Sequence, residues 1–159
     1  MENWLFLLAF TLHNLEEAIW LPAWSRHGGR FHKTVAPFEF RFAAGVITLI
    51  GFVITLQFHL FGNSSNFSGW VFYGFVAMMM VNALFPHLLA TIVLKRYCPG
   101  TATALLLNVP IGAYVLYPHF NGSSDGLTLM MVTLGVSAVI IPLIPLLLFV
   151  GRIPGRFQS

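Results

Sequence analysis

Long apolar stretches alternate with short polar connections along this chain. A helix rises ~1.5 Å per residue, so about 20 apolar residues cross the ~30 Å hydrocarbon core of a bilayer. Five stretches meet or approach this length, with approximate bounds Trp4–Trp24, Phe42–Phe61, Trp70–Leu94, Ala102–Tyr117 and Leu127–Val150. The fourth is short and contains Pro110, which predicts a kink or a tilt. The pattern predicts an all-α protein: a polytopic membrane bundle of five transmembrane helices, with residues 1–159 forming a single transmembrane domain.

The composition agrees with a membrane protein. Hydrophobic residues make up 57% of the chain and charged residues 8%, and the mean hydropathy is +0.81. A soluble domain carries roughly 25% charged residues, so a soluble globular protein is excluded. The net charge of +3 is explained by basic residues in the connections, and we expect no nucleic-acid partner.

The basic residues predict the orientation. All eight Lys and Arg residues flank the stretches in three places: Arg26, Arg30, Lys33 and Arg41; Lys95 and Arg96; and Arg152 and Arg156. The connections 62–69 and 118–126 contain none. Basic connections stay in the cytoplasm, so we expect an N-terminus outside and a C-terminus in the cytoplasm. The HNLEE interruption and the lack of an early basic residue predict a retained first helix. We expect an integral protein of the cytoplasmic (inner) membrane of a prokaryote.

Ionisable residues interrupt the first apolar stretch in the motif HNLEE, residues 13–17. A charge at mid-bilayer costs about 2.5–3.5 kcal/mol, and no Lys or Arg lies in the hydrophobic part of any stretch. Arg41 is the nearest candidate partner. Glu16 and Glu17 follow His13 by three and four residues, so a helix places all three on one face. Protonated carboxyls, a His–Glu pair or a bound metal cation would compensate for the charges.

Polar residues of other stretches fall at similar depth. Measured along the helices from the basic side, Glu17 lies ~10 Å deep and His13 ~16 Å deep. His87 lies ~12 Å deep in the third stretch, and Asn82 lies ~20 Å deep. Pro86 cannot donate to the Asn82 carbonyl, and the kink it predicts would open a small cavity just before His87. Acids and imidazoles of separate helices are therefore expected to meet at one point.

Other polar residues near this layer have simpler interpretations. Asn108, ~12 Å deep in the fourth stretch, and Thr91, one turn after His87, are expected to form structural hydrogen bonds. Glu39 is expected to form an interfacial ion pair with the nearby Arg41. Cys98 is expected to be an unreactive cysteine at the interface.

The ionisable cluster predicts a metal site. Two imidazoles and one carboxylate form a ligand set of catalytic zinc sites, which leaves a position for water, and the same set suits non-haem iron. We predict a divalent metal, with zinc favoured over iron, bound by His13, Glu17 and His87. Glu16, Glu17 and Asn82 are the predicted catalytic residues, and the glutamate that does not bind the metal would be the general base. Which glutamate binds and which titrates is left open.

Three motifs occur in order along the chain: HNLEE at 13–17, His87, and YCPG at 97–100. HNLEE resembles the signature of the HXXEE family of small membrane proteins, which also carries a second histidine and a YXPG motif. The resemblance covers the first four stretches. It implies a shared site and no reaction, because the family is described as being of unknown function. Independently, Pro99 and Gly100 predict a turn that ends the third stretch and begins the fourth.

The leading hypothesis is a membrane-embedded, metal-dependent enzyme that hydrolyses a lipid-like or amphiphilic substrate reached from the cytoplasmic leaflet. A first alternative is a metal-free isomerase that moves protons between His and Glu on a lipid or sterol-like substrate, by loose analogy with five-span sterol isomerases of the emopamil-binding type. A second is a small carrier of a metal ion or proton, although the chain has no inverted repeat. A structural partner protein is the third. Membrane lipid and a lipid-like or amphiphilic small molecule are the expected partners, and homo-oligomerisation is left open.

Overall fold

Helices occupy each of the five apolar stretches in the computed structural model, which describes residues 1–27, 33–62, 67–119 and 123–153. The first two are α1 (Glu2–Ser25) and α2 (Pro37–Phe61). The third runs through α3 (Phe67–Asn82), η1 (Ala83–Leu88) and α4 (Leu89–Leu94). The fourth runs through α5 (Thr101–Thr103), η2 (Ala104–Asn108), α6 (Val109–Leu116) and η3 (Tyr117–His119). The last is α7 (Ser123–Arg152).

The predicted all-α class is confirmed, and no strand occurs among the described residues. Three helical segments are long and apolar enough to cross a membrane: Pro37–Phe61, Phe67–Leu94 and Gly126–Arg152. The segment Thr101–Leu116 is apolar but shorter. These segments support an integral membrane protein, because about 20 apolar residues match the hydrocarbon thickness.

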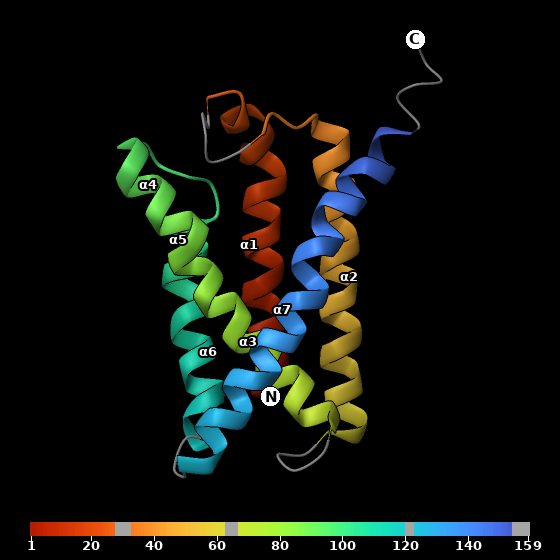
Figure 1. The fold of residues 1–159 in the computed structure, drawn as a ribbon, viewed down its shortest axis with the longest axis vertical. Coiled ribbons are helices and arrows are strands. Elements are labelled where there is room, and N and C mark those ends of the chain that lie inside the picture. The colour runs from red at the N-terminus through yellow and green to blue at the C-terminus, as the bar shows by residue number, and fades with distance from the viewer. Residues whose placement is uncertain (28–32, 63–66, 120–122, 154–159) are drawn as a thin grey trace.

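The basic residues of the described chain gather at one end of the bundle. This end, at the top of Figure 1, carries the C-terminus of α1, the N-terminus of α2, the α4–α5 connection and the C-terminus of α7. We call it the basic end. It carries Arg26, Lys33, Arg41, Lys95, Arg96 and Arg152, whereas Arg30 and Arg156 lie outside the described residues. The other end carries the α2–α3 and α6–α7 connections (Figure 1).

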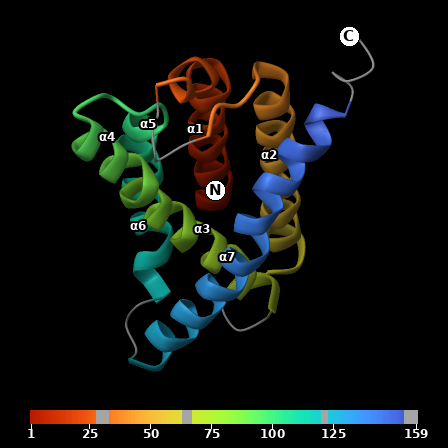
Figure 2. The same cartoon turned by 45° about the horizontal axis from the view of Figure 1, so that its top comes forward.

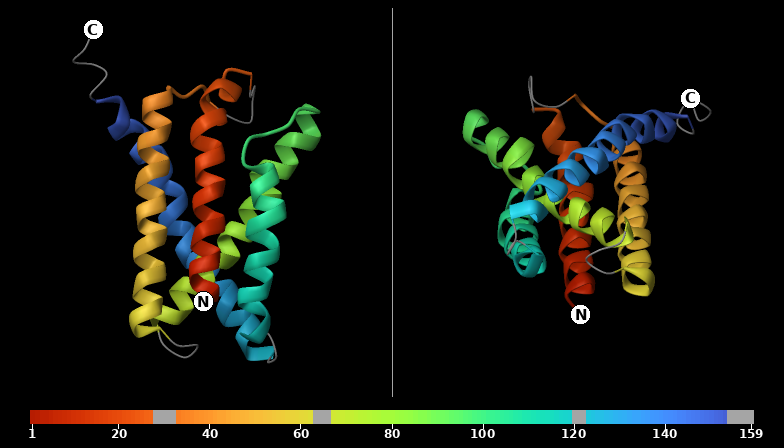
Figure 3. Two further views of the ribbon diagram at one scale, coloured as in Figure 1. Left: turned by 180° about the vertical axis from the view of Figure 1, so that it is seen from behind. Right: turned by 60° about the horizontal axis from the view of Figure 1, so that its bottom comes forward.

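Helices α3 and α7 cross in front of α1 and then lean apart toward the basic end (Figures 1 and 2). Gly74 lies at a close approach of the two helices, since a Cβ there would be 2.8 Å from Cγ1 of Val132 and 3.1 Å from its carbonyl carbon. Seen from behind, α1 lies between α2 and α6 (Figure 3). The divergence of α3 and α7 therefore leaves one side of α1 less covered in the half nearest the basic end.

An aromatic core fills the other half of the bundle. Phe6 and Phe10 of α1 and Phe72 and Phe75 of α3 are fully buried. Their rings meet edge to face, with centroids 6.1 Å apart for Phe6 and Phe75 and 5.1 Å apart for Phe10 and Phe75. Gly51 of α2 packs directly on this core, where a Cβ would lie 2.6 Å from the Phe10 ring. This aromatic half fixes α1 against α2 and α3.

The kink predicted at Pro86 is confirmed. Phe85 has extended backbone angles (φ −132°, ψ 119°) inside η1, as expected for a residue that precedes proline. The helix resumes after the break and continues as α4. The break changes the direction of the chain just before His87.

The predicted ion pair of Glu39 with Arg41 is wrong. The Nε of Arg152 donates to Glu39 Oε2 at 2.9 Å, and the Nε of Arg41 donates to the Ala18 carbonyl at 3.2 Å. Residues two apart on a helix do not face each other, so Glu39 and Arg41 diverge. The end of α7 packs on the start of α2 instead, where a Cβ on Gly151 would be 3.0 Å from Glu39 Cα.

Candidate metal centre

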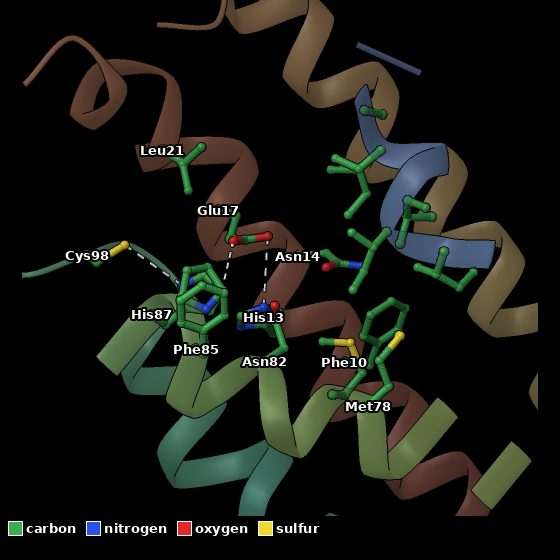
Figure 4. Close-up of a pocket in the computed structure, with 18 of the residues that line it drawn as sticks. Phe10, His13, Asn14, Glu17, Leu21, Met78, Asn82, Phe85, His87 and Cys98 are labelled. Atoms are coloured by element: carbon green, nitrogen blue, oxygen red, sulfur yellow. Dashed lines mark hydrogen bonds and ion pairs between the residues drawn. The ribbon is translucent and has the colours of Figure 1, made fainter. Parts of the chain in front are cut away.

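Three predicted ligands converge on one point between α1 and η1. Oε1 of Glu17 lies 3.2 Å from Nε2 of His87, and Oε2 of Glu17 lies 3.9 Å from Nε2 of His13. The two imidazole rings are nearly perpendicular, with centroids 5.0 Å apart. One potential ligand atom from each residue lies within 4.8 Å of the others. Figure 4 shows the carboxylate of Glu17 between the two rings.

The spacing of this triad suits a small divalent cation. Ligand atoms at ~2.0–2.1 Å from a tetrahedral zinc lie roughly 3.3 Å from one another. The distance from Glu17 Oε1 to His87 Nε2, 3.2 Å, already has this value. The 3.9 Å distance to His13 Nε2 is measured from the other oxygen, Oε2, and one ligand atom from each residue lies within 4.8 Å of the others. Both histidines are buried, and Glu17 is 16% exposed. Side-chain rotations that shorten the longer of these separations would be needed to bring the three ligand atoms to bonding distance.

Hydrogen bonds orient both imidazoles toward Glu17. Nδ1 of His13 lies 3.1 Å from the Gly100 carbonyl oxygen and 3.2 Å from Oγ1 of Thr103. A carbonyl only accepts, so Nδ1 carries the proton and Nε2 keeps its lone pair for a metal. Nδ1 of His87 lies 3.9 Å from Sγ of Cys98, which leaves its Nε2 facing Glu17. Each ligand histidine thus has a partner on its outer nitrogen, as metal-binding histidines generally do.

The neighbouring Glu16 has a different environment. Its Oε1 accepts hydrogen bonds from the Tyr97 hydroxyl and, at 2.9 Å, from the Gly100 N–H. Its Oε2 accepts from the Thr103 hydroxyl at 2.6 Å and from the Thr103 N–H at 3.3 Å. This carboxylate ties the 97–103 turn to α1. The geometry therefore favours Glu17 as the ligand and a positioning role for Glu16, whereas catalysis by either glutamate stays a prediction.

Gly100 lies directly against the triad and has a left-handed backbone (φ +91°). A Cβ at this position would be 2.8 Å from Cε1 of His13, 2.8 Å from Cε1 of His87 and 3.1 Å from Cγ of Glu17. Only glycine avoids both the backbone strain and this contact. The turn predicted at Pro99 and Gly100 is confirmed, and it also forms one wall of the site.

The rest of the turn is held by hydroxyl groups. Thr91 Oγ1 accepts a hydrogen bond from the Cys98 N–H at 3.0 Å and lies 3.0 Å from Oγ1 of Thr101, which confirms its structural role. The Tyr97 pKa is raised to about 12 by burial and by its bond to Glu16, so the phenol remains a donor.

Cys98 is buried beside His87, a contact that the sequence did not predict. The turn folds back onto the bundle and carries this side chain inward. Burial, followed by the negative charges of Glu17 and Glu16, raises the pKa of the Cys98 thiol to about 12. The thiol therefore stays protonated at neutral pH, in agreement with the prediction that it is unreactive.

The two asparagines differ. Asn82 lines the cavity next to the triad (Figure 4), so its catalytic role stays a prediction. Asn108 is fully buried in η2, and neither polar atom of its side chain has a hydrogen-bond partner among the described residues. The structural bond predicted for Asn108 is thus not found. Asn14 instead bonds α1 to α2, donating to Thr48 Oγ1 at 2.8 Å.

A cavity of about 300 Å³ extends from the triad between α1, α2, α3 and α7. His13, Glu17 and His87 contribute one polar wall, and the opposite wall is made of apolar residues such as Ile47, Met78 and Ile140. Ligand sites are typically mostly apolar with a few convergent polar groups, and this cavity has that character.

The residues that build this site lie within the segment that a known family matches. The family described as "Protein of unknown function with HXXEE motif" matches residues 4–115. This segment contains the triad and the whole 97–103 turn. The chain belongs to the HXXEE family. A Bacillus subtilis (strain 168) relative, "Uncharacterized protein YrkK", is 45% identical over 147 residues, which cover 92% of this chain and 92% of the relative. No solved structure gives a significant match.

The geometry gives each element of the HXXEE pattern a distinct place. The motif histidine, its second glutamate and the separate histidine form the triad of His13, Glu17 and His87. The first glutamate, Glu16, binds the YXPG turn. Sequence reasoning missed Thr103 as a partner of both His13 and Glu16, because a threonine three residues after Gly100 carries no signal of its own.

Proposed function

We propose that this HXXEE protein is a membrane-embedded, metal-dependent hydrolase of a lipid-like or amphiphilic substrate. The observation that carries the proposal is the convergence of His13, Glu17 and His87 within 4.8 Å, at one wall of a mostly apolar cavity. Ionisable side chains at membrane depth are costly and are usually functional. Zinc is favoured over iron because two imidazoles and one carboxylate form a known catalytic zinc set.

The proposed membrane placement has five spans, with the N-terminus outside and the C-terminus in the cytoplasm of a prokaryotic cell. The 24 residues of α1 reach ~36 Å, which exceeds the ~30 Å thickness of the hydrocarbon core, and Thr101–Leu116 reaches ~24 Å, which approaches it. The gathering of the described basic residues at one end supports this orientation by the positive-inside rule.

The residues of the site suit hydrolysis of an ester or amide. A bound divalent metal lowers the pKa of a coordinated water to about 7 and polarises a carbonyl. His13 and His87 would hold such an ion through Nε2, and Glu17 would do so through one carboxylate oxygen. The second oxygen of Glu17 accepts a proton from water as the water oxygen bonds to the carbonyl carbon. The bond from that carbon to the leaving oxygen or nitrogen breaks, and the leaving group takes this proton, giving a carboxylic acid and an alcohol or amine.

The test is a hydrolysis assay on purified protein in nanodiscs. A panel of single-chain acyl esters and acyl amides is incubated with protein that has been stripped by chelator or reloaded with zinc, and released fatty acid is measured. We expect release by the zinc-loaded protein, loss in Glu17→Gln and no change in His59→Ala, whose histidine contacts Trp4 far from the site. Zinc-loaded protein that retains its metal but releases no acid from any compound would overturn the hydrolase.

A metal-free proton-transfer isomerase is the second candidate, favoured by one contact. The 3.2 Å distance from His87 Nε2 to Glu17 Oε1 also suits a direct hydrogen bond, with the Cys98 thiol donating to His87 Nδ1. In that case purified protein would contain no metal, and its activity would be unchanged by chelator. A small carrier of metal ions or protons would instead move its ion across liposomes.

A further inference from the structure

We infer that the cavity takes one hydrocarbon chain of a single-chain lipid, which enters sideways from the bilayer between α3–η1 and α7. This inference rests on the proposed function for the chemistry at the triad, but the entry route and the chain are argued from the cavity alone. A soluble substrate entering from the basic end is the arrangement that it excludes.

The exposed residues of the cavity lie along one gap. Val81 and Phe85, on α3 and η1, are 57% and 64% exposed. Ile141 and Ile144, across the gap on α7, are 60% and 38% exposed. All four line the cavity and all four are apolar. The mouth therefore lies where α3 and α7 lean apart, and its most exposed residues are apolar (Figures 1 and 2).

The cavity is closed toward the basic end. The lining residues near that end are Leu21, Trp24, Phe40, Ala90 and Cys98, each no more than 8% exposed. The YXPG turn lies behind them and is fixed to α1 through Glu16. A substrate from the aqueous side would have to displace this packed layer, whereas the side facing lipid needs no such movement.

The depth of the mouth agrees with entry from lipid. Ile141 precedes Arg152 by eleven residues, and Phe85 precedes Lys95 by ten. At ~1.5 Å per residue, both lie about 15 Å from the basic end, or half of a ~30 Å hydrocarbon core. Neighbouring acyl chains would meet this opening directly.

The size and the polarity of the cavity indicate which ligand it takes. A volume of about 300 Å³ is at the lower limit of typical ligand pockets, roughly 300–1,000 Å³, and suits one chain rather than two. Glu17 of α1 and His87 of η1 place polar atoms together at one part of this space (Figure 4). A chain lying along Met78 and Ile140 would therefore present the polar group at its end to the triad.

The experiment uses photolabelling, which requires no turnover. Full-length protein in nanodiscs is mixed with a lysophosphatidylcholine analogue that carries a diazirine in its acyl chain, irradiated and mapped by mass spectrometry. We expect labels on Met78 and Ile140, which line the cavity and are only 8% and 6% exposed. Ile141→Trp and Val81→Trp, from opposite sides of the mouth, should each lose these labels. Val139→Trp, on an exposed residue of α7 outside the cavity, should keep them.

The outcomes separate this inference from the hydrolase. Labels confined to outward-facing residues, and unchanged by both plugging variants, would overturn lateral entry even if hydrolysis were found. Equal labelling of Met78 and Ile140 by a two-chain phosphatidylcholine analogue would overturn the single-chain claim. Labels at both residues in His87→Ala protein that no longer hydrolyses would support the entry route, because entry does not depend on the triad.

Discussion

The two halves of α1 contribute to opposite kinds of environment. In the half remote from the basic end, Phe6 and Phe10 pack edge to face against α3 and are fully buried. In the other half, His13 and Glu17 face His87 across the start of a cavity. Helix α1 and the third stretch thus pack through aromatic rings at one end, whereas at the other end their polar side chains meet beside a cavity.

The aromatic half stabilises the bundle, and the polar half carries the candidate site. Helices in a bilayer associate through packing and hydrogen bonds, since lipid removes the hydrophobic driving force between them. The aromatic half supplies that packing. The polar half contains a helix break at Phe85, a cavity and two acids, each of which costs stability. The two halves should therefore respond separately to substitution, with the largest effects on metal binding in the polar half.

The largest effect is expected from His87→Ala, which removes one of two imidazole ligands. Purified wild-type protein should contain close to one zinc per chain after dialysis, and the variant should contain almost none by plasma mass spectrometry. His59→Ala, at the other end of the bundle, is the matched control and should retain zinc. Equal zinc in wild type and His87→Ala would place any bound metal elsewhere.

A second large effect is expected from Gly100→Ala. The added Cβ would meet both imidazoles at 2.8 Å on a left-handed backbone, so the rings must rotate away from Glu17. Zinc affinity, measured by competition with a chromogenic chelator, should fall by roughly 100-fold or more. Gly135→Ala is the matched control, because no atom lies within 4 Å of the Cβ that it would add. If Gly100→Ala bound zinc normally, the turn would not form a wall of the site.

An intermediate effect is expected from Glu16→Gln, set beside Glu17→Gln. The Glu16 amide would lose charged hydrogen bonds to the turn while every ligand remains, so zinc affinity should fall by about 10–100-fold. Glu17→Gln removes a ligand and should abolish stoichiometric zinc. Measured by the same chelator competition, a reversed order would exchange the roles of the two glutamates.

The smallest effect on zinc is expected from Phe72→Ala, in the aromatic half. Loss of its packing should destabilise the bundle by up to about 3 kcal/mol, since the transfer part of the cost in soluble cores is absent in lipid. Unfolding in detergent by urea or heat measures this, with the exposed Phe149→Ala as control. Zinc affinity of the folded protein should stay unchanged. A large loss of affinity would mean that the halves are coupled.

The helices and the residues of the triad could be predicted from the sequence because their signals are local. Apolar length predicted the five helical stretches, and the three- and four-residue spacing from His13 predicted that both glutamates share its side of α1. Pro86 predicted the break beside His87. Each inference needs only one element and its known geometry.

The parts that failed depend on packing between elements. Glu39 pairs with Arg152, 113 residues away, because α7 returns to the start of α2. The sequence does not distinguish the roles of Glu16 and Glu17. Their environments differ only in the folded protein, where the 97–103 turn packs on α1 and donates hydrogen bonds to Glu16. Cys98 is buried for the same reason. Contacts between residues that are so far apart along the chain leave no recognisable pattern in a single sequence.

The X-ray absorption spectrum of zinc-loaded wild-type protein in nanodiscs tests the metal centre most directly. The account predicts a first shell of nitrogen and oxygen at ~2.0–2.1 Å, with the outer scattering of two imidazoles. A zinc–sulfur distance near ~2.3 Å would identify Cys98 as a ligand and contradict the triad, and protein that holds no zinc after desalting would contradict a metal centre altogether.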